Sequence, residues 1–264
     1  MTILKHFAAK LPLLLLFLFW GGVLNGQNKA GEFYEIKTYK LKNKSQEERV
    51  DAFLKNALLP ALHKQDIKNV GVFKPLETDT TYGKRIVVLI PYASLEQFSK
   101  IPDLLSADEQ FNQKGKEYLD AIYPNPPYDR IESIVLKAFT GNPQMGTPEL
   151  TSPRSERIYE LRSYEGPTEK IYRNKVQMFN LGDEVGLFKR LGFNAVFYAE
   201  VITGNRMPNL MYMTTFANQA SHDAHWKAFV DDPQWKKLSA MPEYQHNVSE
   251  INIYLLRPTE YSDY

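Results

Sequence analysis

The sequence contains no cysteine among its 264 residues. Disulfide bonds, thiolate nucleophiles and cysteine-ligated metals are therefore excluded. An excess of charge of one sign is lacking too, because 32 Lys and Arg residues are balanced by 31 Asp and Glu residues, with a formal net charge of +1. Such a balance provides no broad basic field for nucleic acid or for an anionic membrane surface. We therefore expect no nucleic-acid partner.

Familiar catalytic and cofactor motifs are also absent. There is no G-x-S-x-G elbow, no P-loop and no dinucleotide fingerprint. His222 and His225 are spaced to share one face of a helix, but the H-E-x-x-H pattern of zinc proteases is missing and only Asp223 adds a carboxylate beside them. We therefore predict no metal site and no cofactor. A haem protein that uses His222 is a further alternative, which requires a large apolar pocket at that imidazole.

Long hydrophobic runs are confined to the beginning of the chain. The apolar stretch at residues 11–24 is interrupted by Pro12 and two glycines, and it is shorter than the ~20 residues that span a bilayer. A basic start, a short apolar core and small residues up to Gly26 are typical of a secretory signal peptide. We expect residues 1–26 to be removed near Gln27, and the protein to be secreted or periplasmic with no membrane span in the mature chain.

What the sequence does contain is a pattern that occurs twice. FYEIKTY at Phe33–Tyr39 is matched by IYELRSY at Ile158–Tyr164, 125 positions later. Further along, Phe216 follows Tyr92 by 124 positions, and Trp235 follows Phe111 by the same distance. Two matched pairs at nearly one offset predict a tandem repeat. We expect units at residues 27–140 and 157–264, joined by a Pro- and Gly-rich linker at 141–156.

Each unit shows the same order of expected elements. In the first unit, strands are expected at 33–41, 70–76, 84–92 and 130–139, with a helix from the capping box at Ser45 that Pro60 kinks or ends, and a broken helix with capping boxes at Ser94 and Ser106. In the second unit, strands are expected at 157–164, 193–202, 208–216 and 248–256, with helices after the caps Thr168, Asn218 and Asp232. The order β-α-β-β-α-β is that of a ferredoxin-like unit.

Strand parity divides each predicted sheet into two faces, because successive side chains point to opposite sides. In the second unit, one parity is mostly apolar, and we expect it under the helices: Tyr159, Leu161, Ser163, Phe193, Ala195, Phe197, Met211, Met213, Ile251, Ile253 and Leu255. The other parity mixes charged and aromatic residues, with counterparts in the first unit. Its members, taken as candidate ligand-binding residues, are Glu160, Arg162, Tyr164, Tyr198, Tyr212, Tyr254, Glu35 and Tyr39.

Two such sheets are expected to pack with these mixed faces together and to form a barrel that these residues line. The alternative is a solvated face. Within the barrel, Glu160 and Arg162 would supply a carboxylate and a guanidinium to a ligand cavity with tyrosine walls. The alternative for this pair is a simple ion pair.

Several of these motifs together resemble the NIPSNAP family. The resemblance is carried by YELRSY at Tyr159–Tyr164, by HWKAFVDDPQW at His225–Trp235 and by YEIKTYKL at Tyr34–Leu41, and it extends over about residues 33–257. It implies an α+β fold of the dimeric α+β barrel type, here with two tandem ferredoxin-like units paired within one chain as a pseudo-dimer. The family offers no catalytic residues to carry over. Its better-known members are mitochondrial and linked to vesicle transport and mitophagy signalling, a role that the predicted signal peptide argues against in this chain.

We therefore predict an exported NIPSNAP-like protein that binds a small molecule or a partner through its barrel. The alternative is a cofactor-independent monooxygenase-like enzyme acting on a small molecule in the cavity, an inference from fold analogy. A closed cavity that holds Glu160 and Arg162, with a raised carboxylate pKa, would favour the enzyme. An interior filled by side chains would favour a structural or interaction role. The sequence leaves open whether chains assemble into a homo-oligomer.

Overall fold

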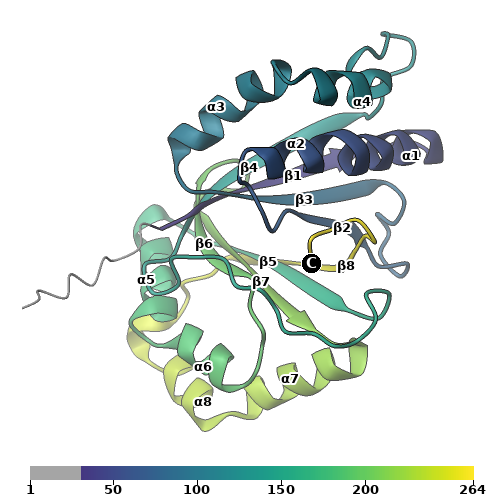
Figure 1. Cartoon of the computed structure of the whole chain (residues 1–264). Helices are drawn as coiled ribbons and strands as arrows, with labels where there is room; N and C mark the ends of the chain where they lie inside the picture. Colours follow the sequence, from purple (N-terminus) through teal and green to yellow (C-terminus); the bar gives the residue numbers. More distant parts are fainter. Residues whose placement is uncertain (1–30) are drawn as a thin grey trace, which may run out of the picture.

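A computed structural model describes residues 31–264 as a closed barrel of eight strands with helices on two opposite sides (Figure 1). The strands are β1 (Phe33–Lys40), β2 (Gly71–Pro75), β3 (Arg85–Tyr92), β4 (Arg130–Ala138), β5 (Ile158–Glu165), β6 (Phe197–Thr203), β7 (Asn209–Phe216) and β8 (Glu250–Pro258). The predicted signal peptide lies outside the described residues. The α+β class and the eight-stranded antiparallel barrel agree with prediction.

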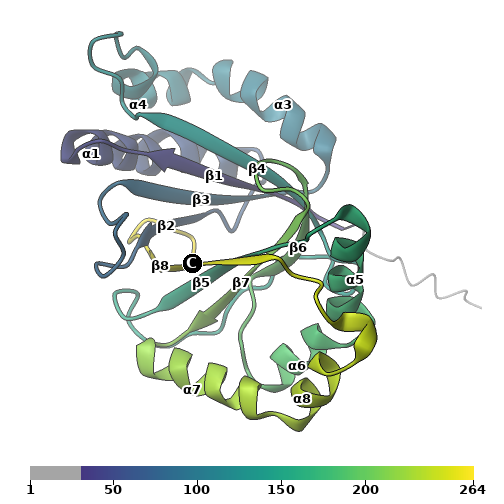
Figure 2. The same ribbon diagram turned by 180° about the vertical axis from the view of Figure 1, so that it is seen from behind.

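Helices of the two halves cover opposite sides of the barrel, as Figure 2 shows from behind. One layer holds α1 (Lys44–Phe53), the π-helical η1 (Leu54–Leu58), α2 (Leu59–Lys64), α3 (Leu95–Ser106) and α4 (Glu109–Leu119). The other holds α5 (Glu169–Asn180), α6 (Glu184–Arg190), α7 (Gln219–Asp231), α8 (Pro233–Ser239) and the short 3₁₀ helix η2 (Pro242–Tyr244). None of the helices within residues 31–264 has the length and apolar character to cross a bilayer.

Strand order runs β1-β3-β2-β8-β5-β7-β6-β4 and then closes on β1. The first half therefore contributes the neighbours β4-β1-β3-β2 and the second half contributes β8-β5-β7-β6, all paired antiparallel. Two short ladders join the quartets. In one, Phe73–Pro75 of β2 pair with Leu256–Pro258 of β8, and in the other β4 pairs with β6 across a register shift at Val135/Leu136. The ends of the barrel are thus built from both halves.

Helix starts follow local capping chemistry. The predicted caps Ser94, Thr168, Asn218 and Asp232 each accept a hydrogen bond from a backbone amide of the helix that follows. The capping boxes predicted at Ser45 and Ser106 are wrong, because α1 begins after Asn43 and α4 after Asp108. These side chains accept from the amides of Gln46 at 3.0 Å and of Phe111 at 2.9 Å. Asn and Asp cap a helix as well as Ser does.

Proline and turn residues interrupt a helix in each half. Pro60, predicted to kink its helix or end the regular part, occupies the first turn of α2, and the π-helical turn η1 separates it from the regular helix α1. A local widening of this kind accommodates a ring that lacks an amide donor. The long helix expected after Thr168 is divided at Asp183, which has a left-handed backbone with φ of 61°. The strand expected from Phe193 begins only at Phe197.

The predicted faces of the second half are wrong on β5, β6 and β7. Tyr159, Leu161, Phe197, Met211 and Met213 pack inside the barrel with residues of the first half. Glu160, Arg162, Tyr164, Tyr198 and Tyr212 lie on the outer face instead, where the last three pack with rings such as Phe179 and Phe188 of the helical layer. Residues Glu35 and Tyr39 lie on the outer face of the first half as well, against its helices.

Two physical reasons explain this inversion. Both faces of each sheet are covered, one by the barrel interior and the other by helices. A set of alternating polar residues therefore does not show which face points away from the helices. Register adds the second reason. Glu160 pairs opposite Leu255 and Arg162 opposite Ile253, so the apolar residues of β8 share the face of the charged residues of β5 rather than that of Tyr159.

One end of the barrel interior is packed solid with aromatic rings. The ring centroids of Tyr34 and Phe197 lie 5.2 Å apart, and those of Phe73 and Tyr159 lie 4.9 Å apart. Tyr264 inserts among them with 5% of its surface exposed. The chain segment that carries it is held by the amides of Val70 and Val72, which donate to Asp263 and Ser262. Side chains therefore fill the barrel interior at this end.

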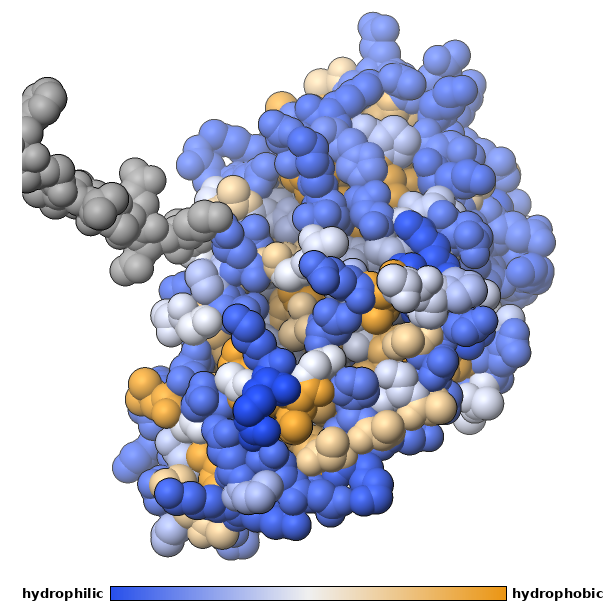
Figure 3. Space-filling view, turned by 60° about the horizontal axis from the view of Figure 1, so that its bottom comes forward, coloured by the Kyte–Doolittle hydropathy of each residue, from blue (hydrophilic) through white to orange (hydrophobic). Residues whose placement is uncertain are grey.

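The outer surface over the second helical layer is largely hydrophilic. In Figure 3, where the lower side of Figure 1 comes forward, hydrophobic residues form several smaller groups among hydrophilic ones. Single exposed apolar side chains, such as Leu181 and Val230, belong to this half. Scattered residues of this kind are normal on a protein surface.

Candidate functional site

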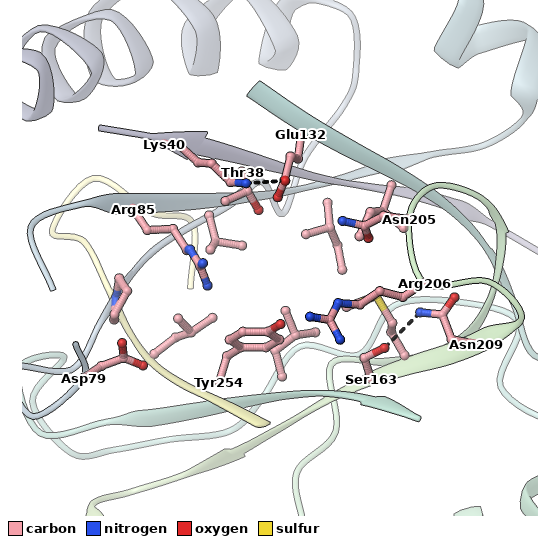
Figure 4. Close-up of a pocket in the computed structure, with 17 residues that line it drawn as sticks. Thr38, Lys40, Asp79, Arg85, Glu132, Ser163, Asn205, Arg206, Asn209 and Tyr254 are labelled. Carbon is pink, nitrogen blue, oxygen red and sulfur yellow. Dashed lines mark hydrogen bonds and ion pairs between the residues drawn. The ribbon is translucent and has the colours of Figure 1, made fainter. Parts of the chain in front are cut away.

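A pocket of about 180 Å³ opens at the end of the barrel opposite the aromatic end (Figure 4). We call it the barrel-mouth pocket. Apolar side chains from both halves form its floor: Ile36, Val87, Ile134, Leu161, Met211 and Leu256. Polar and charged side chains surround them: Thr38, Lys40, Asp79, Arg85, Glu132, Ser163, Asn205, Arg206, Asn209 and Tyr254. Pro75 completes the wall.

The pocket follows from the alternation of the strands. On β1, the inward positions run from Tyr34 and Ile36 in the packed interior to Thr38 and Lys40 at the mouth. Each strand thus changes from apolar to polar as it approaches this end. The hairpin loops β2–β3 and β6–β7 complete the rim with Asp79 and with Asn205 and Arg206.

Close approach of the β6–β7 loop to β4 depends on Gly204. Its backbone has φ of +153°, and a Cβ atom there would lie 3.0 Å from Cγ2 of Ile134. A larger residue would both strain the backbone and push the loop outward. Gly204 therefore helps to hold Asn205 and Arg206 at the mouth.

Three cationic side chains enter the pocket, and they differ in their partners. Lys40 is paired with Glu132. Arg206 Nη1 lies 2.8 Å from Oε1 of Glu165 and 3.3 Å from Oε1 of Glu250. Arg85 has no carboxylate within 4.0 Å among residues 31–264, and its guanidinium lies over the Tyr254 ring, 5.6 Å from the centroid. The mouth therefore contains one guanidinium without an ion-pair partner.

Polar groups deeper in the pocket are mostly bound to each other. The Asn209 Nδ2 amide donates to Ser163 Oγ at 2.9 Å, and both residues are buried. The other amide atom, Oδ1, is buried without a hydrogen-bond partner among the described residues. At the rim, Thr81 donates twice to Asp79, and these hydrogen bonds hold the pKa of Asp79 below its ordinary value. Asp79 thus stays ionised.

Glu160 and Arg162, the predicted cavity pair, instead form a buried cluster beneath α7. Arg162 Nη2 lies 2.7 Å from Glu160 Oε1, and the guanidinium stacks 3.6 Å from the Trp226 ring centroid. Trp226 Nε1 donates to Glu160 Oε2 at 2.5 Å. The cluster continues outward, because Arg162 donates to the Tyr164 hydroxyl at 3.2 Å, which lies 2.9 Å from that of Tyr212. These contacts match the ion-pair alternative.

The pKa of Glu160 opposes a role as a proton donor. Burial by itself would raise it, but His222, Arg162 and Trp226 outweigh burial and hold the pKa of Glu160 below its ordinary value of 4.5. A raised carboxylate pKa in a cavity was the feature that would favour an enzyme. Glu160 shows neither the raised pKa nor the cavity.

His222 lies between two carboxylates. Its Nε2 is 3.3 Å from Glu160 Oε2, without the geometry of a hydrogen bond, and its Nδ1 is 2.8 Å from Asp223 Oδ1. Both ring nitrogens thus face acidic groups, and the ring packs against Phe216 at 4.9 Å. This arrangement does not fit an axial haem ligand. Across the described residues, no three His, Asp or Glu side chains gather in a way that could hold a metal ion.

The first-half candidates border a second pocket, of about 280 Å³, between the sheet and its helices. Glu35 accepts hydrogen bonds from Ser133 Oγ at 2.7 Å and from the Tyr92 hydroxyl at 3.1 Å, and Lys37 lies 3.4 Å away. Burial raises the pKa of Tyr39, so its hydroxyl stays protonated. We call this the helix-layer pocket.

Of the predicted ligand-binding residues, Tyr254 alone lies in the barrel-mouth pocket. Sequence reasoning missed Arg85, Arg206 and Lys40. A signal for them was present, since each stands at a strand end or in a hairpin loop, where side chains of two halves can meet. Whether the predicted residues bind a ligand stays a prediction.

Solved structures show the same fold at low sequence identity. A proposed monooxygenase from Lactobacillus acidophilus NCFM has a TM-score of 0.57 and 12% identity, with 86% of this chain and 94% of that chain covered. A proposed monooxygenase from Fusobacterium nucleatum has a TM-score of 0.55 and 8% identity, with 87% and 93% covered. At such identities the likeness concerns the fold alone.

A NIPSNAP family protein from Agrobacterium tumefaciens matches 40% of this chain and 96% of its own, with 16% identity and a TM-score of 0.36. No curated protein matches the sequence. The family model described as NIPSNAP matches residues 159–263, which run from β5 through β8 to the end of the chain. The second half of this chain is therefore similar to a NIPSNAP domain.

Proposed function

We propose that this protein binds a small molecule in the barrel-mouth pocket, and that its two halves are tandem ferredoxin-like units paired as a pseudo-dimer. The arrangement of units is supported by the strand orders β4-β1-β3-β2 and β8-β5-β7-β6, which place equivalent strands in equivalent positions. Both hairpin loops at the mouth, β2–β3 and β6–β7, then correspond to each other. A ligand between them touches both units.

The observation that carries the proposal is the contrast between the two ends of the barrel interior. Small barrels are ordinarily filled by side chains, and the aromatic end follows that rule. At the mouth, Arg85 lacks an ion-pair partner within residues 31–264 and a buried amide oxygen of Asn209 lacks a hydrogen-bond partner. The buried amide oxygen costs stability unless something binds there, and the guanidinium beside an apolar floor can pair with an anionic ligand.

The proposal is tested by a variant that fills the pocket. Thr38 lines the mouth and is only partly buried, so Thr38→Trp blocks the pocket with little disturbance of the core. The purified protein is dialysed against a metabolite mixture, and retained compounds are identified by mass spectrometry. We expect wild type and the control Ser99→Trp, on the exposed surface of α3, to retain a compound that Thr38→Trp loses. Equal retention by all three proteins, or none by any, contradicts the proposal.

The monooxygenase alternative rests on the shared fold, and no residue of the barrel-mouth pocket adds support for it. It is tested on the same material, by measuring oxygen consumption with each retained compound. We expect none above the level of Thr38→Trp. Consumption by wild type that Thr38→Trp loses would establish the enzyme.

We also propose that the protein is exported, on the basis of the three-part layout of residues 1–26. Intact-mass measurement of the protein isolated from its native cells tests this. A mature chain that begins near Gln27 supports export, and a full-length chain retained in the cytoplasm contradicts it.

A further inference from the structure

Two arginines on opposite sides of the barrel-mouth pocket point toward the same space. Arg85 comes from the start of β3 in the first half, and Arg206 comes from the β6–β7 loop in the second. Figure 4 shows their guanidinium groups directed toward the centre of the pocket, with Tyr254 of β8 beside both. The Tyr254 ring centroid lies 5.6 Å from Arg85 Cζ. A charged group placed there contacts both halves of the protein.

We propose that the ligand of this pocket is a small monocarboxylate with an apolar body, its carboxylate held between Arg85 and Arg206. This inference rests on the proposed ligand-binding function and names the class of ligand. A guanidinium offers two parallel N–H donors that match the two oxygens of a carboxylate. The two arginines together supply more donors than one carboxylate accepts, so Arg206 keeps its bonds to Glu165 and Glu250.

The charge of the ligand follows from the partners of the three cations. Lys40 is neutralised by Glu132, and Arg206 by Glu165 and Glu250. Arg85 alone has no carboxylate within 4.0 Å in the described part of the chain, and Asp79 attracts it only at longer range. Because the four carboxylates around the mouth outnumber its three cations, the mouth accommodates only the single negative charge that Arg85 can pair with. A dianion such as a phosphate monoester would bring a second charge close to Asp79 and Glu132.

The remainder of the ligand is apolar and small. Beneath the two arginines the floor consists of aliphatic side chains and Met211, and the Tyr254 ring forms one wall. Pockets for drug-sized ligands measure roughly 300–1,000 Å³. The barrel-mouth pocket, at about 180 Å³, accepts a molecule well below that size. An aromatic acid with one ring fits these conditions.

The test compares three one-ring probes by isothermal titration calorimetry on the purified protein. Benzoate carries one negative charge, benzyl alcohol carries none, and phenyl phosphate carries nearly two. We expect wild type to bind benzoate more tightly than either of the others. Arg85→Gln leaves a shorter, polar side chain without the charge, and we expect it to weaken benzoate binding about 10- to 100-fold, the loss of a charge-assisted hydrogen bond. Binding of benzyl alcohol should change less than about 3-fold, because no ion pair is lost.

Two further variants guard against misfolding. Arg85→Lys retains the charge but lacks the two parallel N–H donors of a guanidinium, and it should bind benzoate more tightly than Arg85→Gln does. Arg173→Gln removes an exposed arginine of α5 that does not line the pocket, and it should bind all three probes as wild type does. Thermal melting checks that each variant is folded.

Different results separate the two proposals. Equal binding of benzoate and benzyl alcohol, or equal benzoate binding by wild type and Arg85→Gln, overturns the monocarboxylate. So does tighter binding of phenyl phosphate, or no benzoate binding at millimolar concentration. In all these cases a compound retained by wild type and lost in Thr38→Trp still supports a ligand pocket. Failure of that comparison overturns the pocket itself.

Discussion

The outer faces of the two halves carry the same strand pattern and use it differently. Glu35 of β1 and Glu160 of β5 occupy corresponding positions in the two halves. Glu35 pairs with Ile90 of β3, and Glu160 pairs with Thr214 of β7, which lies 124 positions after Ile90. In the first half the Tyr92 hydroxyl donates to Glu35. At the corresponding place in the second half stands Phe216, which has no hydroxyl, and Glu160 is bound by Trp226 and approached by His222.

The helices determine whether the space above the carboxylate is open or filled. With the same offset, Trp226 of α7 corresponds to Pro102 of α3. The indole of Trp226 fills the space beside Glu160 and stacks on Arg162. Pro102 instead borders the open helix-layer pocket of about 280 Å³. Two strands of similar pattern therefore acquire a packed ion pair in one half and a cavity in the other. The helical layer therefore decides what a strand motif does.

The largest difference between the halves is expected at this tryptophan and proline. Trp226→Ala removes ring contacts with Phe188, Phe193 and Phe229 and a donor to Glu160, and we expect it to lower the free energy of unfolding by about 3–5 kcal/mol. Pro102 lies inside α3 and borders an existing cavity, so Pro102→Ala restores a helix amide, and we expect no loss and a gain of up to about 3 kcal/mol. Urea unfolding measures both. Equal losses would show that the two helical layers are packed alike.

A smaller difference is expected between the two carboxylates. Glu160→Gln leaves Arg162, with 14% of its side chain exposed, without a buried counter-charge, and should cost about 3 kcal/mol. Glu35→Gln leaves Lys37, whose side chain is 27% exposed and can be hydrated, and should cost about 1 kcal/mol. Thermal or urea unfolding gives the order. If Glu35→Gln is the more damaging change, the description of Glu160 as the buried ion pair is wrong.

The smallest difference concerns pH. Burial alone would lower the pKa of His222, but the nearby carboxylates of Glu160 and Asp223 outweigh it and raise this pKa above 6.5. The stabilisation that results is complete below pH 6.5 and is lost as the pH rises through the folded-state pKa. Phe98, at the corresponding place in the first half, does not titrate.

We therefore expect wild type to lose about 1 kcal/mol or less relative to His222→Gln as the pH rises above this range. Melting temperatures across the neutral range measure it. His246→Gln, at an exposed site, serves as the control and should keep the wild-type slope. A His222→Gln variant with an unchanged slope would mean that His222 is not ion-paired in the folded protein.

Sequence reasoning located most elements but assigned the faces of β5, β6 and β7 to the wrong sides, and particular residues show why. Thr168, Asn218 and Asp232 cap helices as predicted, because a cap depends on residues three positions apart. The inward face of β5 could not be read in the same way. The alternation of its side chains is plain in the sequence. Which set points inward depends on whether the charged residues have partners on a helix, here Trp226 and His222, which lie 60 or more residues away in the chain.

The sequence by itself determined the α+β class, the twice-repeated order of elements, most helix caps and the resemblance of the second half to a NIPSNAP domain. These depend on local patterns and on self-similarity, which need no knowledge of distant contacts. Two features follow only from the folded chain: which face of each strand points into the barrel, and the approach of Arg85 and Arg206 on either side of Tyr254. These neighbours arise when the barrel closes. Residues about 120 positions apart become neighbours only when β2 joins β8 and β4 joins β6, and no periodicity along the chain records that pairing.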